Sequence, residues 1–175
     1  MFQRKQLGVT LVGLCITLAV SATLLGKALP AMTGAQQHQH LRADADQLRA
    51  DIQEARQLAL GRGNNVQIHV ESACYIVHDG APGACQCDFV RHEAVCVGPA
   101  QVLKIRWPAA SLASNVSRDL TLAAHRGTAS PGATLSLRNR NGEELHQIIA
   151  ITGRVRGCAV GGASNGLTAC PEKSS

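Results

Sequence analysis

The chain has very few aromatic side chains and few charges for its length. Only four of its 175 residues are aromatic, 17% are charged and 45% are hydrophobic. A nucleic-acid surface built on base stacking depends on aromatic side chains, so this composition argues strongly against one. The high apolar fraction excludes a disordered chain. The length suits one domain with an appendage. With so few aromatics, the apolar content of the chain must come from Ala, Val, Leu and Ile.

The aliphatic residues are concentrated near the N-terminus. No charged side chain occurs over the 20 residues 7–26. A helix of that length spans about 30 Å, the thickness of the hydrocarbon core of a bilayer. The basic residues Arg4 and Lys5 precede this run and would stay cytoplasmic. The sequence therefore predicts a transmembrane helix over about residues 9–30. A signal peptide cleaved near Ala31 is the alternative.

A second helical pattern follows the apolar run, from about residue 36 to residue 60. The apolar residues that recur there at three- and four-residue spacing are Leu41, Ala45, Leu48, Ile52, Ala55 and Ala59. They form a narrow stripe on one helix face, and Gly61-Arg62-Gly63 ends the pattern. We predict one long helix over residues 9–62, interrupted near Gly26, Pro30 and Gly34 and kinked at Pro30.

A short basic leader ends in Gly8, directly before the apolar run that begins with Val9-Thr10-Leu11-Val12. This pattern resembles the leader of a type IV pilin or pseudopilin. The resemblance implies that a prepilin peptidase removes residues 1–8 between Gly8 and Val9 and methylates the N-terminus of Val9. It also implies a single-pass protein of the bacterial inner membrane, with its head in the periplasm. Its helix would pack with other pilins in a pilus or pseudopilus.

One position departs from the pilin pattern. Gly13 stands where the family usually has a glutamate that pairs with the amine of a neighbouring subunit. A lone charge in lipid is costly unless it is paired, so the loss of this glutamate does not harm membrane insertion. It does favour a minor subunit over a repeating subunit of the filament shaft.

Beyond Gly63 the hydrophobic period changes from helical to alternating. The candidate strands are residues 66–70, 102–106, 120–122, 134–137 and 145–151. Turn residues separate them, and Asn141-Gly142 is the strongest hairpin signal, joining residues 134–138 to residues 145–151. The predicted fold class is α+β, with the long N-terminal helix followed by a β-rich, disulfide-stapled pilin head over residues 63–175.

Six of the seven cysteines fall in the head, at Cys74, Cys85, Cys87, Cys96, Cys158 and Cys170. An even number outside the cytoplasm indicates three disulfides, each contributing roughly 2–4 kcal/mol. Local spacing favours Cys158–Cys170, while Cys85 and Cys87 would each join Cys74 or Cys96. Zinc bound by Cys85, Cys87 and His92 is a weaker alternative, because a one-residue gap between cysteines is shorter than in common zinc sites. We expect neither a metal nor a cofactor.

The histidines and acidic residues form no catalytic pattern. His69, His78 and His146 occupy alternating strand positions, so we expect them to face solvent. His38 and His40 indicate a polar patch on an exposed helix, with a metal or pH sensor as the alternative. No Ser–His–Asp order, carboxylate pair or Gly-rich phosphate loop is recognisable, so we expect no enzyme.

Arginines are concentrated in the second half of the head. Between Arg118 and Arg156 there are six arginines, no lysine and three acidic residues. Arginine suits bidentate contacts to phosphate, although a solvated strand face partly paired to Glu143 and Glu144 is the simpler interpretation. Arg138 and Arg140 have a two-residue spacing that would place them on one strand face, and Arg154 and Arg156 have the same spacing. If the two segments lie near each other, the four guanidinium groups form one basic patch.

Two motifs in this region resemble those of pseudopilins of the GspH/FimT type. They are His125-Arg126-Gly127-Thr128 and Gly153-Arg154-Val155-Arg156. In FimT-type minor pilins the second motif is implicated in binding DNA during natural transformation. The resemblance thus implies DNA-binding roles for Arg154 and Arg156, with Gly153 allowing the turn.

The favoured interpretation is a FimT-like minor type IV pilin that takes part in pilus assembly and binds the DNA backbone independently of sequence. The alternative is a GspH-like minor pseudopilin of a type II secretion system. In that case the head is a protein–protein module at the tip of the pseudopilus.

Overall fold

The computed structural model describes the backbone of residues 11–162 and 166–171, and their side chains except for residues 23–33. The chain divides into two compact units, residues 1–36 and residues 37–175, which are described separately. The predicted leader and the cleavage site between Gly8 and Val9 lie outside the described residues.

Helix α1 (Leu11–Arg62) is helical throughout. It continues through Gly26, Pro30 and Gly34, so the predicted interruption of the helix is wrong. A proline removes one backbone hydrogen bond, and the turns on either side of it can still propagate the helix. At the other end, Gly63 has φ 68° and its amide donates to the carbonyl of Ala59 at 3.1 Å, which ends the helix.

The first unit contains the N-terminal part of α1. Its large apolar side chains from Leu11 to Val20 are exposed. No helix within the described residues is long and apolar enough to cross a membrane. The predicted span over about residues 9–30 lies partly outside the described residues, because the side chains of residues 23–33 are not described.

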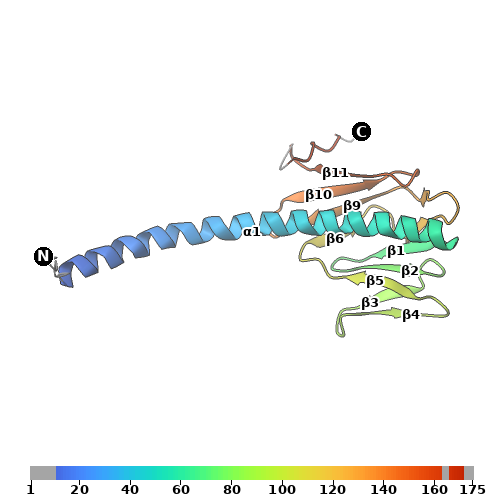
Figure 1. The fold of residues 1–175 in the computed structure, drawn as a ribbon, viewed down its shortest axis with the longest axis horizontal. Coiled ribbons are helices and arrows are strands. Elements are labelled where there is room, and N and C mark those ends of the chain that lie inside the picture. Colours follow the sequence, from blue (N-terminus) through green and yellow to red (C-terminus); the bar gives the residue numbers. More distant parts are fainter. Residues whose placement is uncertain (1–10, 163–165, 172–175) are drawn as a thin grey trace, which may run out of the picture. The chain divides into compact units, whose positions relative to one another are not determined.

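The second unit holds the head, whose described strands form three antiparallel sheets (Figure 1). The five-stranded sheet has the order β5-β2-β1-β7-β8, and its strands are β1 (Val66–Val70), β2 (Tyr75–Asp79), β5 (Val102–Arg106), β7 (Leu120–Leu122) and β8 (Ala129–Ser130). The four-stranded sheet has the order β11-β10-β9-β6, and its strands are β6 (Ser111–Ser114), β9 (Ala133–Arg138), β10 (Glu144–Ile149) and β11 (Val155–Ala159). The third sheet is a hairpin of β3 (Cys85–Asp88) and β4 (Glu93–Cys96).

The predicted strands correspond to β1, β5, β7, β9 and β10, and the α+β fold class is confirmed. Asn141-Gly142 lies in the turn of the β9–β10 hairpin, where Arg138 is opposite Glu144. Sequence reasoning missed β2, β3, β4, β6, β8 and β11. Two of these are cysteine-containing strands of four residues, and β8 has only two residues, so period-2 alternation has little length in which to show.

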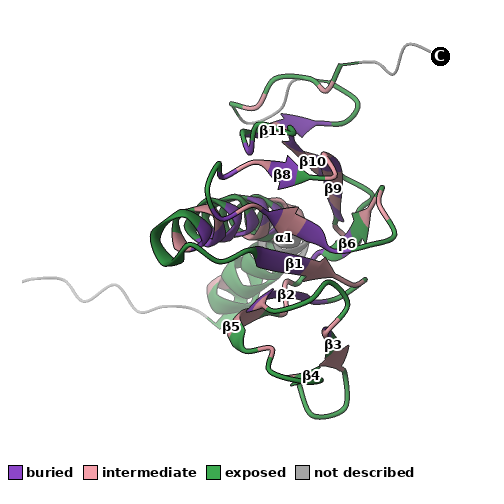
Figure 2. Cartoon of the chain, turned by 90° about the vertical axis from the view of Figure 1, so that its right-hand side faces the viewer, coloured by how far each residue is buried: buried purple, intermediate pink, exposed green. Residues whose placement is uncertain are grey.

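One hydrophobic core joins α1 to both larger sheets (Figure 2). The predicted stripe of six apolar residues, from Leu41 to Ala59, is buried throughout. It packs on β-sheet residues that alternate along their strands, such as Leu135 and Leu137 of β9. The amphipathic helix is therefore the layer that covers both sheets, as its narrow apolar stripe requires.

All six cysteines of the head are in disulfides, namely Cys74–Cys87, Cys85–Cys96 and Cys158–Cys170. The first attaches the β3–β4 hairpin to the residue that precedes β2, and the second joins β3 to β4 within the hairpin. Both border a small second core around Ile76. The third ties the segment around Cys170 to β11. Cys15, in the first unit, is free and exposed.

Candidate functional site

The two sequence motifs lie against each other in the fold. Gly127 is in the turn between β7 and β8, and Gly153 is in the turn between β10 and β11. Their φ angles are 58° and 77°, in the left-handed region that favours glycine. A Cβ atom at residue 153 would overlap the carbonyl oxygen of Gly127. The turns thus approach so closely that a side chain at residue 153 is excluded.

Arg56 of α1 holds the two turns together. Its Nε donates to the carbonyl oxygen of Gly127 at 2.8 Å, and its Nη2 lies 3.4 Å from the carbonyl oxygen of Thr152. The amide of Ala129 donates to the carbonyl of Ile151 at 2.9 Å, which adds a backbone link between the same two segments. One guanidinium group therefore joins the helix to a turn of each large sheet.

The arginines next to these glycines are available to a ligand. Arg126, Arg154 and Arg156 are all exposed. Within the described part of the chain, none of the three forms an ion pair. The sequence has no acidic residue in the segments 120–130 and 150–157 that build the two turns. Among the described residues, no ion pair therefore compensates the positive charge of these three arginines.

Arg138 and Arg140 do not belong to this group. Arg138 ends β9 and Arg140 lies in the following turn, so the two do not share a strand face as predicted. The register places Arg156 opposite Ile148, which is opposite Thr134, four residues before Arg138. At about 3.3 Å per residue this separates Arg138 from Arg156 by about 13 Å along the strands, in addition to two strand spacings across them. The four arginines thus do not form the single basic patch that the sequence suggested.

The two glutamates of the β9–β10 hairpin pair with other groups. Glu143 Oε2 accepts a hydrogen bond from Asn139 Nδ2 and lies 3.1 Å from His38 Nδ1. Glu144 Oε1 lies 2.7 Å from His146 Nε2. Among the described residues, neither glutamate forms an ion pair with an arginine. The simpler interpretation of a partly neutralised arginine face therefore does not describe this hairpin.

A second polar cluster attaches α1 to the five-stranded sheet. The buried carboxylate of Asp51 accepts hydrogen bonds from Tyr75 Oη at 2.8 Å, Lys104 Nζ at 2.9 Å and Arg106 Nε at 3.1 Å. Gln47 Nε2 donates to it from one turn earlier in the helix at 2.8 Å. Burial raises the pKa of Asp51, but these hydrogen bonds together outweigh burial and the pKa lies below its ordinary value.

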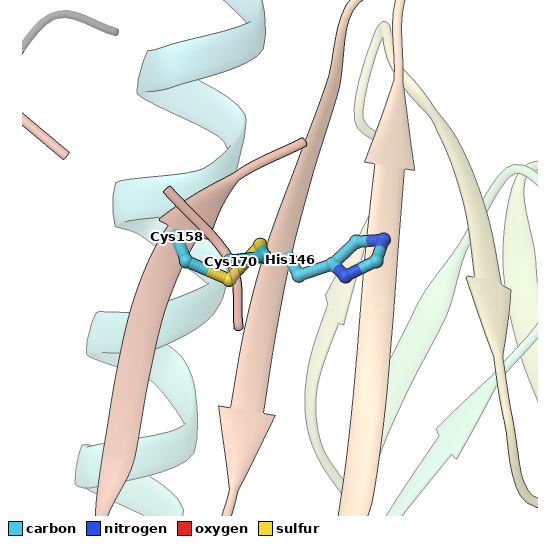
Figure 3. Close-up of side chains that lie close together, drawn as sticks. All are labelled: His146, Cys158 and Cys170. Atoms are coloured by element: carbon cyan, nitrogen blue, oxygen red, sulfur yellow. A yellow bond between two sulfur atoms is a disulfide. The ribbon is translucent and has the colours of Figure 1, made fainter. Parts of the chain in front are cut away.

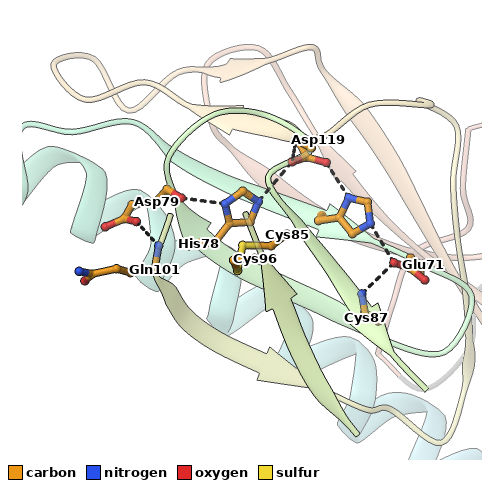
Figure 4. Close-up of a disulfide and its surroundings, with 10 residues drawn as sticks. Glu71, His78, Asp79, Cys85, Cys87, Cys96, Gln101 and Asp119 are labelled. Carbon is orange, nitrogen blue, oxygen red and sulfur yellow. Dashed lines mark hydrogen bonds and ion pairs between the residues drawn. A yellow bond between two sulfur atoms is a disulfide. The ribbon is translucent and has the colours of Figure 1, made fainter. Parts of the chain in front are cut away.

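A third polar cluster lies beside the β3–β4 hairpin (Figure 4). Asp119 contacts two imidazoles, with its Oδ1 2.7 Å from His69 Nδ1 and its Oδ2 3.2 Å from His78 Nε2. The amide of Gly83 also donates to Asp119, at 2.7 Å. Burial raises the pKa of Asp119, but these hydrogen bonds lower it by more than burial raises it. The pKa therefore lies well below its ordinary range. Asp119 and His78 are buried, and the cluster connects β1 and β2 to the residue that precedes β7.

The predicted solvent exposure is wrong for His78, and His69 and His146 are only partly exposed. His78 is fully buried, and the side chains of His69 and His146 are only 22% and 25% exposed. His69 Nε2 lies 3.0 Å from Glu71 Oε1, so each ring nitrogen faces a carboxylate. The hydrogen bond to Asp119 raises the pKa of His69, burial lowers it, and the contact with Glu71 raises it again, leaving it above its ordinary value. Alternation gives the face of a strand on which a side chain lies, but it does not show whether other parts of the fold cover that face.

One trio of residues has metal-ligand chemistry. Ligand atoms of His146, Cys158 and Cys170 lie within 4.8 Å of one another (Figure 3). The two sulfur atoms are joined in a disulfide, so neither is the thiolate that binds zinc. Cys85 and Cys87, the cysteines of the alternative zinc site, are likewise each joined to another cysteine.

Sequence reasoning missed the role of Arg56. This residue lies 71 positions before Gly127, within an ordinary polar helix face. No local pattern distinguishes it from Arg49 or Arg62 on the same helix. Arg126 was visible as part of a motif, but only the contact between Gly127 and Gly153 places it beside Arg154.

Comparison with known proteins identifies a family through the second half of α1 and most of the head. The sequence profile of the family described as "Type II transport protein GspH" matches residues 44–153, more than half of the chain. This range includes the apolar helix stripe from Ala45 to Ala59, both large sheets except β11, and both glycines of the paired turns. No curated protein sequence and no solved structure matches the chain. The chain belongs to the GspH family of pilin-like minor pseudopilins.

Proposed function

We propose that this protein is a FimT-like minor pilin that joins a pilus through its N-terminal helix and binds DNA through the paired turns of its head. Family membership supports the pilin-like, non-enzymatic role. The observation that supports DNA binding is the acid-free end of the head, where Arg154 and Arg156 are exposed without carboxylate partners among the described residues. Guanidinium groups in such surroundings favour phosphate oxygens.

The proposed processing and location follow the pilin pattern. A prepilin peptidase cleaves between Gly8 and Val9 and methylates Val9. The apolar run then anchors the chain in the inner membrane, with its head in the periplasm and about residues 9–30 crossing the bilayer. Loss of Arg4 and Lys5 with the leader lowers the net charge of +5 by two. N-terminal sequencing of the membrane-extracted protein tests this proposal, since cleavage near Ala31 would instead identify a secreted protein.

The DNA proposal is tested by binding of the full chain, kept in detergent micelles, to a fluorescent duplex over a range of salt concentrations. Each phosphate contact contributes about 0.9 to the slope of log affinity against log salt. Replacing both Arg154 and Arg156 by Gln should therefore lower the slope by about 1.8 and weaken binding at every sequence tested. Replacement of Arg138 and Arg140 by Gln, which removes the same charge, is the control. Equal binding by the wild type and the Arg154/Arg156 variant would refute DNA binding through this motif.

A second candidate function is supported by the family description. A pseudopilin of a type II secretion system would use the same head as a protein–protein module at the pseudopilus tip. Cross-linking of the full chain in cells, followed by identification of the attached subunits, separates the two functions. Pilus subunits would support the first, and subunits of a secretion system would support the second.

A further inference from the structure

We propose that the two motif turns form a single phosphate-binding site, in which Arg126 contacts DNA beside Arg154 and Arg156 while Arg56 positions both turns. The inference rests on the proposed DNA-binding function and extends it to residues outside the Gly153–Arg156 motif. Its ligand is the phosphate backbone of double-helical DNA.

The backbone geometry brings Arg126 and Arg154 to one place. Arg126 directly precedes Gly127, and Arg154 directly follows Gly153. The Cα of Gly153 lies so close to the carbonyl of Gly127 that no Cβ would fit between them. The backbones of the two arginines therefore lie close together and both side chains are exposed, although 28 positions separate the residues in the chain. Arg156 extends this surface onto the first residues of β11.

The charges around the site leave its arginines without internal partners. Glu54 is the acidic residue of α1 closest in sequence to Arg56, and its carboxylate pairs with Lys104. Asp119 precedes β7, but both of its oxygens are used by His69, His78 and the amide of Gly83. An incoming phosphate therefore meets no competing carboxylate from either neighbouring element, which strengthens its attraction to the guanidinium groups.

Arg56 acts as a positioning residue. Its Nε and Nη2 point to the carbonyl oxygens of Gly127 and Thr152, so its donors on that side are occupied by protein. The planar guanidinium fork fixes the separation of the two carbonyls, which a lysine ammonium cannot do in the same way. Its side chain also fills the space next to Gly127, where a Cβ would lie 2.7 Å from Arg56 Nε. Loss of this fork would thus remove the side-chain link between the turns that carry Arg126 and Arg154.

The chemistry of the site favours phosphates over bases. The site includes no aromatic side chain. The exposed aromatic ring of the head, Phe89, packs edge-on against Trp107 at 5.6 Å, near the β3–β4 hairpin. Binding should therefore be independent of sequence and strongly dependent on salt. Duplex DNA presents phosphates on two strands at fixed spacing, which suits several arginines held at fixed separation.

The experiment compares single variants of the full chain in the same duplex-binding assay. Arg126→Gln should lower affinity and reduce the salt slope by about 0.9, as should Arg154→Gln. Arg138→Gln removes the same charge from the far end of the sheet and should leave the slope unchanged. Arg56→Lys keeps the charge but not the fork. It should weaken DNA binding while circular dichroism shows the head still folded at the assay temperature.

The outcomes distinguish this inference from the proposed function. If the Arg154/Arg156 double variant loses binding while Arg126→Gln keeps the wild-type slope, the motif binds DNA but the shared site does not exist. If Arg126→Gln and Arg138→Gln weaken binding equally, general charge is responsible and the shared site is again refuted. If wild-type binding is absent, the proposed DNA function itself fails. If the Arg56→Lys variant is folded and binds DNA as tightly as the wild type, the positioning role of Arg56 is refuted.

Discussion

The Nε of Arg56 donates a hydrogen bond of 2.8 Å to the carbonyl oxygen of Gly127. This bond connects α1 to the turn of the five-stranded sheet, and the same guanidinium approaches Thr152 in a turn of the four-stranded sheet. One side chain of the helix thus contacts turns of both larger sheets. The residues that make the contact possible are glycines, because side chains at residues 127 and 153 would occupy the space of Arg56 and of the facing backbone.

The first prediction concerns this close approach. Gly153→Ala should lower the free energy of unfolding by about 3 kcal/mol or more, because it adds an overlap with the Gly127 carbonyl to the cost of a left-handed φ. Gly98→Ala is the control, since Gly98 has φ 70° but open space around its Cβ position. That variant should lose only about 1–2 kcal/mol. Chemical denaturation of both variants measures the difference, and equal losses would show that the turns are not in contact.

The second prediction concerns the buried carboxylate of α1. Asp51→Ala should cost about 1–3 kcal/mol, because it leaves the buried Tyr75 hydroxyl without its acceptor and removes one partner from each of the partly exposed Lys104 and Arg106 side chains. Glu54→Gln removes the more exposed partner of Lys104 and should cost less than about 1 kcal/mol. Denaturation of the two variants at neutral pH tests this contrast. Similar losses for both would show that the burial of Asp51 does not matter.

The third prediction concerns pH. The pKa of His69 is higher in the folded protein than in the unfolded chain, where it is about 6.5, so the charged form of His69 stabilises the fold. This stabilisation is complete below about pH 6.5 and is lost as the pH rises through the folded-state pKa. The difference in unfolding free energy between wild type and His69→Gln should therefore shrink from mildly acidic to mildly alkaline pH. Asp119→Asn removes the first cause of the raised pKa, so this trend should weaken in that background. A difference that grows with pH would have the wrong sign.

The fourth prediction concerns the loss of stability in acid that Asp119 causes. The folded pKa of Asp119 is lowered, so its stabilising contribution is present above about pH 3.9 and is lost as pH falls towards the folded value. In acid, wild type should lose stability relative to Asp119→Asn. Thermal unfolding of the two proteins between mildly acidic and strongly acidic pH measures this effect. Parallel curves would contradict it.

The last prediction concerns the C-terminal disulfide. Replacing Cys158 and Cys170 by Ser opens a loop with a sequence separation of 12 and should cost about 2–3 kcal/mol. The amide of Cys170, which donates to the carbonyl of Ala159, should exchange its hydrogen faster, while amides of β1 should keep their relative protection. Cys15→Ser, at a free cysteine, is the control and should leave the head unchanged. Unaltered exchange at Cys170 would show that hydrogen bonds alone hold the segment.

The elements of this fold that could be predicted are those in which a regular hydrophobic pattern repeats over many residues. The helix stripe from Leu41 to Ala59 repeats over five turns, and β9 and β10 alternate on both sides of Asn141-Gly142. The burial of His78 could not be predicted in this way. All residues from Tyr75 to His78 in β2 are buried, because α1 covers one face of the strand and the β3–β4 hairpin region covers the other. Local alternation carries no information on whether a second face is covered.

For the arginines, too, some properties could be predicted from the sequence and others depend on tertiary contacts. Their number, against three acidic residues between Arg118 and Arg156, is a property of the chain alone, and arginine suits bidentate contacts to phosphate. Which arginines act together depends on strand register and on two turns from different sheets. Register separates Arg138 from Arg156, and the contact of Gly127 with Gly153 joins Arg126 to Arg154.

By itself the sequence determined the α+β class, the amphipathic helix, the turn at Asn141-Gly142 and the scarcity of aromatics that argues against base stacking. These features depend on residues within a few positions of one another, whose spacing defines a face of a helix or strand. Only the tertiary structure decided that Arg56, 71 positions away, reaches Gly127. A hydrogen bond of that kind forms when packing of the helix on two sheets brings distant groups within reach, and no local period encodes it.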